Sequence, residues 1–269
     1  MKILLWIRNE NTQKALANKI AEHMPIAGII TESRKSSLKR SFKDYYEKIY
    51  EKLFLPSVGK AWWKMLEHYQ NLYPEYPKTE ILDVENINSE EAYNFSIKIQ
   101  PDLIIVSGTR LVKEKMLSIA PSKGITNLHT GLSPYIKGGP NCTNWCIATK
   151  NFHLIGNTVM WIDLGIDTGN LITTELTPFS GKEKNLLDVH ITVMEHAHDL
   201  YIRALKKIYS GETVPNVPQN TITNGITFYN KQWNLQQKKN LIYNFPLFLK
   251  YLNTNDFKNQ QKEVITVSL

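Results

Sequence analysis

The chain has 269 residues, a net charge of +7, and hydrophobic and charged fractions of 42% and 21% that are ordinary for a soluble globular protein. Its length suits one large domain, or one domain with an appendage. No apolar run approaches the roughly 20 residues of a membrane span, and two cysteines exclude a disulfide framework.

The N-terminal sequence MKILLWIRNENTQ has only five consecutive apolar residues before Arg8, too few for the core of a signal peptide. We therefore expect a cytoplasmic protein in which Cys142 and Cys146 remain reduced.

The positive charge is concentrated in two stretches. Residues 34–60 carry eight Lys/Arg and three Asp/Glu, so +5, and residues 220–269 carry six Lys and two acids, so +4. Such stretches attract the phosphate groups of nucleotides, nucleic acid or lipid. A solvated surface explains each stretch equally well.

Strands and helices alternate along most of the chain. The expected strands cover residues 2–7, 26–32, 80–84, 102–108, 124–130, 157–164 and 171–179. The expected helices cover residues 12–24, a segment after the capping sequence at 88–91, residues 112–120, and residues 184–210 with Gly211 as the C-terminal cap. This alternation is typical of an α/β protein with a Rossmann-like, mostly parallel sheet flanked by helices.

Residues 213–269 follow as an expected C-terminal appendage to a catalytic domain of residues 1–212. The sequence VPNVPQN interrupts regular structure, and ITNGIT at 222–227 predicts a hairpin because Asn-Gly suits a type I′ turn. The last forty residues have a helical pattern that frays at its end.

Residues 36–77 interrupt the alternation with a helical, basic segment that is rich in Tyr, Trp and Phe. An excursion of this length between two strands is typical of a lid or a partner surface. A helical pair that packs on the sheet edge is the equally weighted alternative.

The sequence NLHTGLSPYIKGGP places an amide and an imidazole at the end of a strand. Side chains two apart in a strand point to the same face, so Asn127 and His129 can face one cleft. Ligands of open α/β sheets bind beyond the carboxyl ends of the strands. A carboxylate, Asp167, lies in a second irregular loop between Gly165 and Gly169.

Amide, imidazole and carboxylate together suit acyl transfer to an amine. The amide N–H can stabilise a developing oxyanion. A neutral imidazole with a pKa near 7 can take the proton of an attacking ammonium, and the carboxylate can fix its tautomer and raise its basicity. No nucleophile is required.

GITNLHTGLSPYIKGG followed by GNTVMWIDLGIDTGNLI resembles the folate-dependent formyltransferase family, over residues 1 to about 210. The family includes glycinamide ribonucleotide, methionyl-tRNA and sugar N-formyltransferases. The resemblance implies N10-formyltetrahydrofolate as co-substrate, no metal, and Asn127, His129 and Asp167 as the catalytic residues. It further implies pterin contacts from Arg110, Leu111, Val112, Trp161, Ile162 and Asp163, and acceptor contacts from Lys137, Gly138, Gly139 and Asn141.

Two departures from the family pattern concern the acceptor side. The common Ser-Leu-Leu-Pro is Gly-Leu-Ser-Pro at 131–134, and the usual Arg before Gly is Lys137. The loop IRNENTQ has no glycine, which disfavours the ribonucleotide phosphate. The roughly fifty residues after Pro215 are too few for the β-barrel of the tRNA enzymes, so we expect nucleic acid to be an unlikely partner, although tRNA binding through 36–77 remains open.

A UDP- or dTDP-linked amino sugar is therefore the expected acceptor, of the kind used in lipopolysaccharide or O-antigen biosynthesis. Aromatic side chains can stack on the nucleobase, and the diphosphate can meet Arg34, Lys35, Lys39 or Arg40. Sugar enzymes of this length end in a short appendage that is often a dimer contact, so we expect a homodimer.

Other functional classes remain as alternatives, namely a protease, a metal-binding protein and a membrane-docking protein. IDTG is also an aspartic-protease signature, but that class needs two such loops in an all-β fold. Cys142 and Cys146 can suggest a metal, yet two small apolar side chains one turn apart explain them better. His196 and His198 lie on different helix faces and form no chelate. Residues 36–77 can also dock on an anionic membrane, alone or in addition to catalysis.

Overall fold

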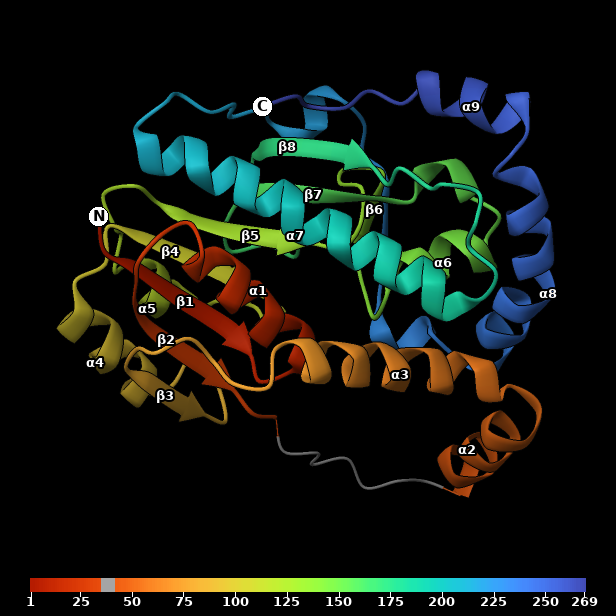
Figure 1. Cartoon of the computed structure of the whole chain (residues 1–269), viewed down its shortest axis with the longest axis horizontal. Helices are drawn as coiled ribbons and strands as arrows, with labels where there is room; N and C mark the ends of the chain where they lie inside the picture. The colour runs from red at the N-terminus through yellow and green to blue at the C-terminus, as the bar shows by residue number, and fades with distance from the viewer. Residues whose placement is uncertain (35–41) are drawn as a thin grey trace.

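A computed structural model describes residues 1–34 and 42–269 of the chain. The expected mostly parallel, Rossmann-like sheet is confirmed: seven strands lie in the order β3-β2-β1-β4-β5-β7-β8 (Figure 1). The first five strands of this order run parallel to one another. Strand β7 is antiparallel to its neighbour β5, and β8 is antiparallel to β7. The strands are β1 (Ile3–Arg8), β2 (Ile26–Glu32), β3 (Ile81–Val84), β4 (Leu103–Ser107), β5 (Ile125–His129), β6 (Ile136–Gly138), β7 (Gly156–Trp161), β8 (Leu171–Leu176) and β9 (Ile226–Phe228).

Helices cover both faces of the sheet and one of its ends. They are α1 (Asn11–Ala21), α2 (Phe42–Phe54), α3 (Pro56–Leu72), α4 (Glu90–Ile99), α5 (Glu114–Leu117), α6 (Cys142–Ala148), α7 (Leu186–Ser210), α8 (Leu235–Tyr251) and α9 (Asn255–Lys262), with short 3-10 turns η1 (Phe152–Leu154), η2 (Gln219–Thr221) and η3 (Asn230–Gln232). The predicted C-terminal cap is confirmed, because Gly211 ends α7 with φ of +83°. The capping box expected at 88–91 is replaced by a simple N-cap, in which the Ser89 side chain accepts a hydrogen bond from the N–H of Ala92.

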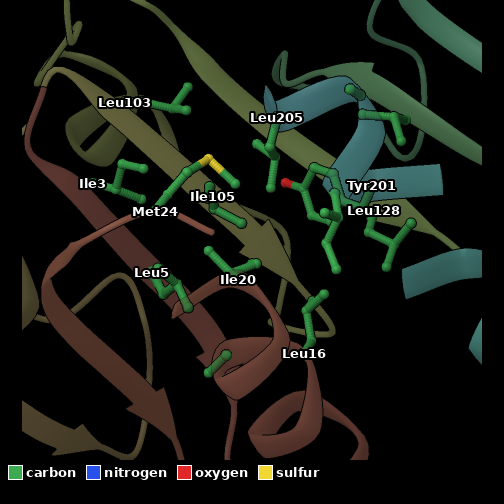
Figure 2. Packing of buried hydrophobic residues seen from close by; sticks show 14 of the residues in the cluster. Ile3, Leu5, Leu16, Ile20, Met24, Leu103, Ile105, Leu128, Tyr201 and Leu205 are labelled. Carbon is green, nitrogen blue, oxygen red and sulfur yellow. The ribbon is translucent and has the colours of Figure 1, made fainter. Parts of the chain in front are cut away.

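Alternate residues of each strand enter two different cores, as strand geometry requires. Ile3, Leu5 and Ile7 of β1 face α1 and α7, where Leu16 and Tyr201 are fully buried (Figure 2). The intervening residues of β1 face α4 and α5 on the other side. The sheet therefore holds its strand ends rigidly between two apolar layers.

The segment expected at 36–77 is a pair of helices. Helix α3 packs against α1 and α7, and α2 contacts mainly α3 (Figure 1). Met65 and Tyr69 of α3 are fully buried, whereas α2 exposes Phe42, Tyr45 and Tyr46. The alternative of a packed helical pair therefore holds for α3, which is packed against the rest of the protein. Helix α3 packs on α1 and α7, however, and not on the edge of the sheet. Residues 35–41 lie outside the described part of the chain.

The predicted hairpin at 222–227 is wrong. Gly225 has φ of +59°, but Asn224 lacks the positive φ that a type I′ turn also needs, and the strand that follows, β9, pairs in parallel with β6. Two long-range contacts override the local signal: the N–H of Ile226 donates to the carbonyl of Tyr135, and a side chain at position 225 would collide with Pro134.

The C-terminal segment packs on the rest of the molecule. Helix α8 lies against α6 (Figure 1), with Leu241 and Phe248 fully buried. The final residues return to β8, where Val267 bonds to Thr173 and Thr174. Among the described residues, no helix is both long and apolar enough to cross a membrane.

Candidate active site

The strand β5 ends at the point where the sheet changes from parallel to antiparallel. It pairs in parallel with β4 and antiparallel with β7, where His129 lies opposite Thr158. Asn127 and His129 both line one cavity at this end of the sheet, as the two-residue spacing predicted. His129 is 8% exposed, so substrate that reaches it leaves bulk water behind.

Asp167 comes to His129 from the loop between β7 and β8. Its Oδ2 lies 3.4 Å from Nδ1 of His129 and accepts a hydrogen bond of 3.0 Å from the N–H of Gly138. Asp167 has φ of +52° in the left-handed region, a conformation that Asp tolerates better than most residues. The side chain of Gln219 holds this loop by donating to the carbonyls of Asp167 and Gly169, both at 2.8 Å.

The imidazole of His129 differs from the neutral base that the sequence suggested. Burial disfavours its charged form, but the Asp167 carboxylate, the Cys142 thiol and the Ile136 carbonyl outweigh burial and raise the pKa of His129 to about 10. The ring is therefore an imidazolium at neutral pH in the free protein. Asp167 stabilises the protonated form of His129, as expected. The resulting pKa of His129 is higher than the value near 7 that the sequence suggested.

Cys142 is part of this site and is more than an apolar side chain. Its Sγ lies 3.6 Å from Nε2 of His129 and 3.5 Å from the carbonyl oxygen of Gly138, to which the thiol donates. Burial raises the pKa of the Cys142 thiol, so the thiol stays protonated. Gly131 is required here, because any side chain at that position would collide with His129 and Cys142.

The cavity has a volume of about 820 Å³ and reaches from the end of β1 to the C-terminal segment. Its walls come from the ends of β4, β5 and β7, the loop 163–169, helices α3, α6 and α7, and the residues after β9. This volume suits two substrates of moderate size side by side.

Arg110, Leu111 and Val112 line one end of this cavity. Within the described chain, no hydrogen bond occupies the backbone N–H of Leu111 or Val112, so both are available to a ligand. The N–H of Arg110 is not, because it donates to Glu32 at 3.0 Å.

Glu32 supports the cavity wall from behind, without lining the cavity, and sequence reasoning missed it. It is fully buried at the end of β2 and accepts hydrogen bonds from the Ile87 N–H and from the guanidinium groups of Arg34 and Arg110. Burial alone would raise the pKa of Glu32, but these hydrogen bonds hold it below the usual value. An acidic residue at the end of an apolar strand was the available signal.

Trp161, Ile162 and Asp163 also line the cavity. The N–H of Ile162 already donates to the carbonyl of Ile125, and the Asp163 carboxylate accepts from Gly165 and Thr168 within its own loop. Asp163 therefore shapes the loop, and free donors and acceptors for a ligand are fewer here than at Leu111 and Val112.

The expected acceptor residues divide into two groups. Gly138, Gly139 and Asn141 line the cavity, whereas Lys137 is not among its lining residues and pairs with Thr227 in the small β6–β9 sheet. Arg34 lines the cavity, and Lys35, Lys39 and Arg40 lie outside the described residues. The cavity wall also includes residues that no local motif announced, namely Trp62, Asn144, His190, Tyr229 and Trp233.

Over residues 1–34 and 42–269, no group of three or more His, Cys, Asp or Glu side chains could hold a metal ion. Cys146 is buried in the core between α6 and α8.

Comparison with known proteins adds to this geometry. The family model described as formyl transferase matches residues 60–205. A methionyl-tRNA formyltransferase from Citrifermentans bemidjiense is 30% identical over 125 residues, which are 46% of this chain and 38% of that protein. This chain spans only 38% to 60% of the length of the first three methionyl-tRNA formyltransferases that match it.

Solved structures show the same fold. A 4-N formyltransferase from Francisella tularensis is 17% identical with a TM-score of 0.55, covering 86% of this chain and 78% of that one. An N-formyltransferase from Helicobacter canadensis, solved with folinic acid and dTDP-3-aminofucose, is 18% identical with a TM-score of 0.55, covering 90% and 80%. The α/β architecture excludes the aspartic-protease alternative, which needs an all-β fold.

Proposed function

The chain belongs to the formyl transferase family, and on this basis we propose that it transfers a formyl group from N10-formyltetrahydrofolate to the amino group of a nucleotide-linked amino sugar. The observation that carries the proposal is the convergence of Asn127, His129 and Asp167 on one cavity. These three side chains come from two separate segments, and a purely structural role explains neither the cavity nor the charge pair.

The residues suit a folate at one end of the cavity. Leu111 and Val112 offer free backbone N–H groups, and the buried Val106 and Val112 offer apolar surface for a flat ring. Glu32 fixes the Arg110 backbone and guanidinium, so this wall is rigid before a ligand arrives. The bound folate supplies an activated formyl group.

His129 acts as a proton carrier that starts in its charged form. The imidazolium can donate to the formyl oxygen as negative charge develops there, and Asn127 can add its amide N–H. Once the imidazolium has given its proton to the oxyanion, the neutral ring can take the proton of the attacking amine and pass it to the departing folate nitrogen. Collapse of the intermediate to the amide releases the hydroxyl proton back to the ring, which ends as it began. Asp167 holds the ring in place through Nδ1, while Nε2 bonds to the Ile136 carbonyl at 3.2 Å and lies 3.6 Å from the Cys142 thiol. Donation to the formyl oxygen therefore requires Nε2 to exchange the Ile136 carbonyl for the substrate.

The similarity to the sugar enzymes supports an amino sugar as acceptor. Two solved N-formyltransferases align over 86% and 90% of this chain, and one of them was solved with dTDP-3-aminofucose. In this chain the segment after α7 closes the cavity with Tyr229, Asn230 and Trp233, which suits a compact acceptor that is enclosed on several sides.

Methionyl-tRNA is the second candidate acceptor, and the sequence relatives support it. The exposed Tyr45, Tyr46 and Trp63 on α2 and α3 offer stacking surfaces near several lysines. Docking on an anionic membrane would use the same exposed side chains of α2 and α3, and no other observation supports it.

A panel of acceptors separates these candidates. The purified protein is incubated with N10-formyltetrahydrofolate and either UDP- and dTDP-linked amino sugars or methionyl-tRNA, and products are identified by mass spectrometry. We expect a formylated nucleotide sugar. Turnover of methionyl-tRNA alone moves the function to the second candidate, and the absence of any formylated amine refutes the proposal.

We further propose a catalytic domain of residues 1–212, an appendage of residues 213–269 and a homodimer. Tyr243 and Leu247, one turn apart on α8, are 75% and 43% exposed and form an apolar spot suited to a subunit contact. Light scattering of the full chain and of a Tyr243→Lys variant tests the dimer.

A further inference from the structure

A polar pair in the cavity wall, Asn144 of α6 and His190 of α7, has no part in the chemistry above. Nε2 of His190 donates to Oδ1 of Asn144 at 2.9 Å. Both side chains line the cavity, and they are only 6% and 4% exposed. Burial lowers the pKa of His190 to about 4, so the ring is neutral and carries a single N–H.

This hydrogen bond fixes the orientation of the Asn144 amide. With Oδ1 taken by His190, the remaining donor group is Nδ2, and within the described chain no hydrogen bond is made by Nδ2. Nδ2 keeps access to solvent in the cavity, so a ligand bound there can accept its hydrogen bond in place of water. The N-cap bond of Asn141 to the N–H of Asn144 holds the backbone at the same point.

The pair lines the same cavity as His129. Asn144 follows Cys142 by two residues on α6, and the Cys142 thiol contacts His129. On the α7 side, the carbonyl of Val193 accepts a hydrogen bond from Asn157, the neighbour of Thr158, which lies opposite His129. Because Asn144 and His129 line the same cavity, a ligand group that meets Asn144 can belong to the molecule that presents its amine to His129.

The wall next to the pair is apolar. Trp62 of α3 meets the His190 ring edge to face, with centroids 6.1 Å apart, and Met65 and Met194 complete the surface. Met65 is fully buried and Met194 is 7% exposed. This surface suits a small apolar group and disfavours a hydroxyl, which would lose its water without gaining a partner.

We propose that Asn144, positioned by His190 and flanked by Trp62, Met65 and Met194, is an acceptor subsite for an amine that carries an oxygen on the neighbouring carbon and a small apolar substituent. The inference rests on the proposed formyl transfer to an amine. A 6-deoxy amino sugar meets the description through its ring hydroxyl and its methyl group. A methionyl ester meets it through its carbonyl oxygen and its side chain, so the test has an arm for each.

The first experiment measures binding without turnover. Titration calorimetry with dTDP-3-aminofucose, and filter binding with methionyl-tRNA, are performed in the presence of folinic acid. We expect Asn144→Asp and His190→Leu to weaken binding of one acceptor about tenfold or more, the scale of one lost hydrogen bond to a buried donor. Because Gln keeps an N–H donor near the Nε2 position, His190→Gln should bind within about threefold of wild type.

A matched control lies on the same helix. His196 also pairs with an asparagine, Asn157, at 2.9 Å, but neither residue lines the cavity. His196→Leu and His196→Gln should leave acceptor binding unchanged, and folinic acid should bind all variants equally. A general loss of folding would weaken folinic acid binding too.

The apolar wall has its own test. Wild type should bind dTDP-3-aminofucose more tightly than the 6-hydroxy counterpart, and Trp62→Ala should reduce that preference by about tenfold, the scale of one buried apolar group. In kinetics, Asn144→Asp should raise the acceptor KM and leave the folate KM unchanged.

The outcomes separate this inference from the proposed function. If Asn144→Asp and His190→Leu bind both acceptors as wild type does, or if wild type binds neither acceptor, the subsite is refuted. If binding weakens as expected but no formylated product forms, the subsite stands and the proposed function falls. If product forms with an unchanged acceptor KM in every variant, the proposed function stands and the subsite falls.

Discussion

Asp167 lies 3.4 Å from His129 and is itself held by the Gly138 N–H and, through its own carbonyl, by Gln219. The carboxylate that controls the proton on His129 is thus fixed by one residue of the β6 strand and one of the C-terminal segment. The protonation state of the site depends on contacts between three parts of the chain.

Replacement of Asp167 by Asn should convert His129 from imidazolium to neutral imidazole. The carboxylate is the first of the groups that raise the pKa of His129 against burial, so its loss should lower that pKa, opposed only by the Cys142 thiol and the Ile136 carbonyl. NMR titration of the imidazole measures the change, and kcat should fall by roughly 10²–10⁴. Asp199→Asn, an exposed carboxylate on α7, is the control. An unchanged titration of His129 would show that another group holds its proton.

Loss of His129 itself should affect turnover more than donor binding. His129→Asn should lower kcat by roughly 10²–10⁴, while folinic acid still binds, because the proposed folate contacts are backbone groups of Leu111 and Val112. Near-normal turnover at saturating substrates would mean that the loop after β5 binds substrate without taking part in the chemistry.

Asn127→Ala should cost on the order of 10²–10³ in kcat, the scale of one oxyanion donor. An amide does not titrate near neutral pH, so the shape of the pH–rate profile should not change. Rate measurements from pH 6 to 9 test both points, and a shifted profile would assign Asn127 to positioning His129 instead.

Alkylation should distinguish the two cysteines. Cys142 lines the cavity and contacts His129, whereas Cys146 is buried away from it. N-ethylmaleimide should inactivate the wild type, more slowly when folinic acid is bound, and faster as the pH rises because the raised thiol pKa leaves little thiolate at neutral pH.

The two Cys→Ser variants complete this test. Cys146→Ser should be inactivated like wild type, and the remaining activity of Cys142→Ser should resist the reagent. If Cys146→Ser resisted N-ethylmaleimide and Cys142→Ser did not, Cys142 would not be the thiol whose alkylation inactivates the protein.

Gln219→Ala should loosen the loop that carries Asp167. The variant loses two hydrogen bonds of 2.8 Å and leaves the carbonyls of Asp167 and Gly169 without this donor, at a cost of roughly 1–3 kcal/mol in the free energy of unfolding. We expect kcat to fall about tenfold while folinic acid still binds. Thr221→Ala, which removes only a local bond to Pro218, is the control, and equal losses from both variants would refute a specific role.

Acid should destabilise the protein through His198 on α7. This ring is fully buried beneath Tyr69, and both of its nitrogens lack a partner in the described structure. Burial, aided by Lys19, lowers the pKa of His198 to about 3.

The sign follows from proton binding. Below pH 6.5 the unfolded chain takes up a proton at His198 that the folded chain refuses, so stability is complete above pH 6.5 and falls as the pH decreases toward 3. At pH 5 the loss is roughly 2 kcal/mol, from about 1.4 kcal/mol per pKa unit. Urea unfolding at pH 7 and pH 5 should show a smaller pH effect in His198→Leu than in wild type. An equal effect in both would exclude His198 as the source.

Local patterns predicted the catalytic end of the sheet because its determinants are local. Asn127 and His129 follow from a two-residue period at a strand end, and Asp167 from the glycines that bracket it. Glycine, polar spacing and an apolar run are all visible within a few residues of sequence.

The rest of the cavity depends on contacts between distant segments, which leave no local pattern. Trp62, His190 and Trp233 reach one wall from three segments that are far apart in the chain. The hairpin prediction failed for the same reason, because Asn-Gly marks a turn but cannot say which strand lies next to it. The charge of His129 was also misjudged, because the balance of burial and a nearby carboxylate exists only in the folded state.

The parallel pairing of β6 with β9 joins the loop after β5 to a segment that is synthesised almost a hundred residues later, so we expect activity to appear late in synthesis. Ribosomes release the chain from its N-terminus, so β5 and α7 can be assembled while β9 is still unmade. Until Phe228 has emerged, Gly138 lacks its strand partner, and the loop that carries Asp167 lacks Gln219. A nascent chain that ends at α7 should therefore be folded in its sheet yet incompetent in catalysis, and activity should appear only after the C-terminal segment is made.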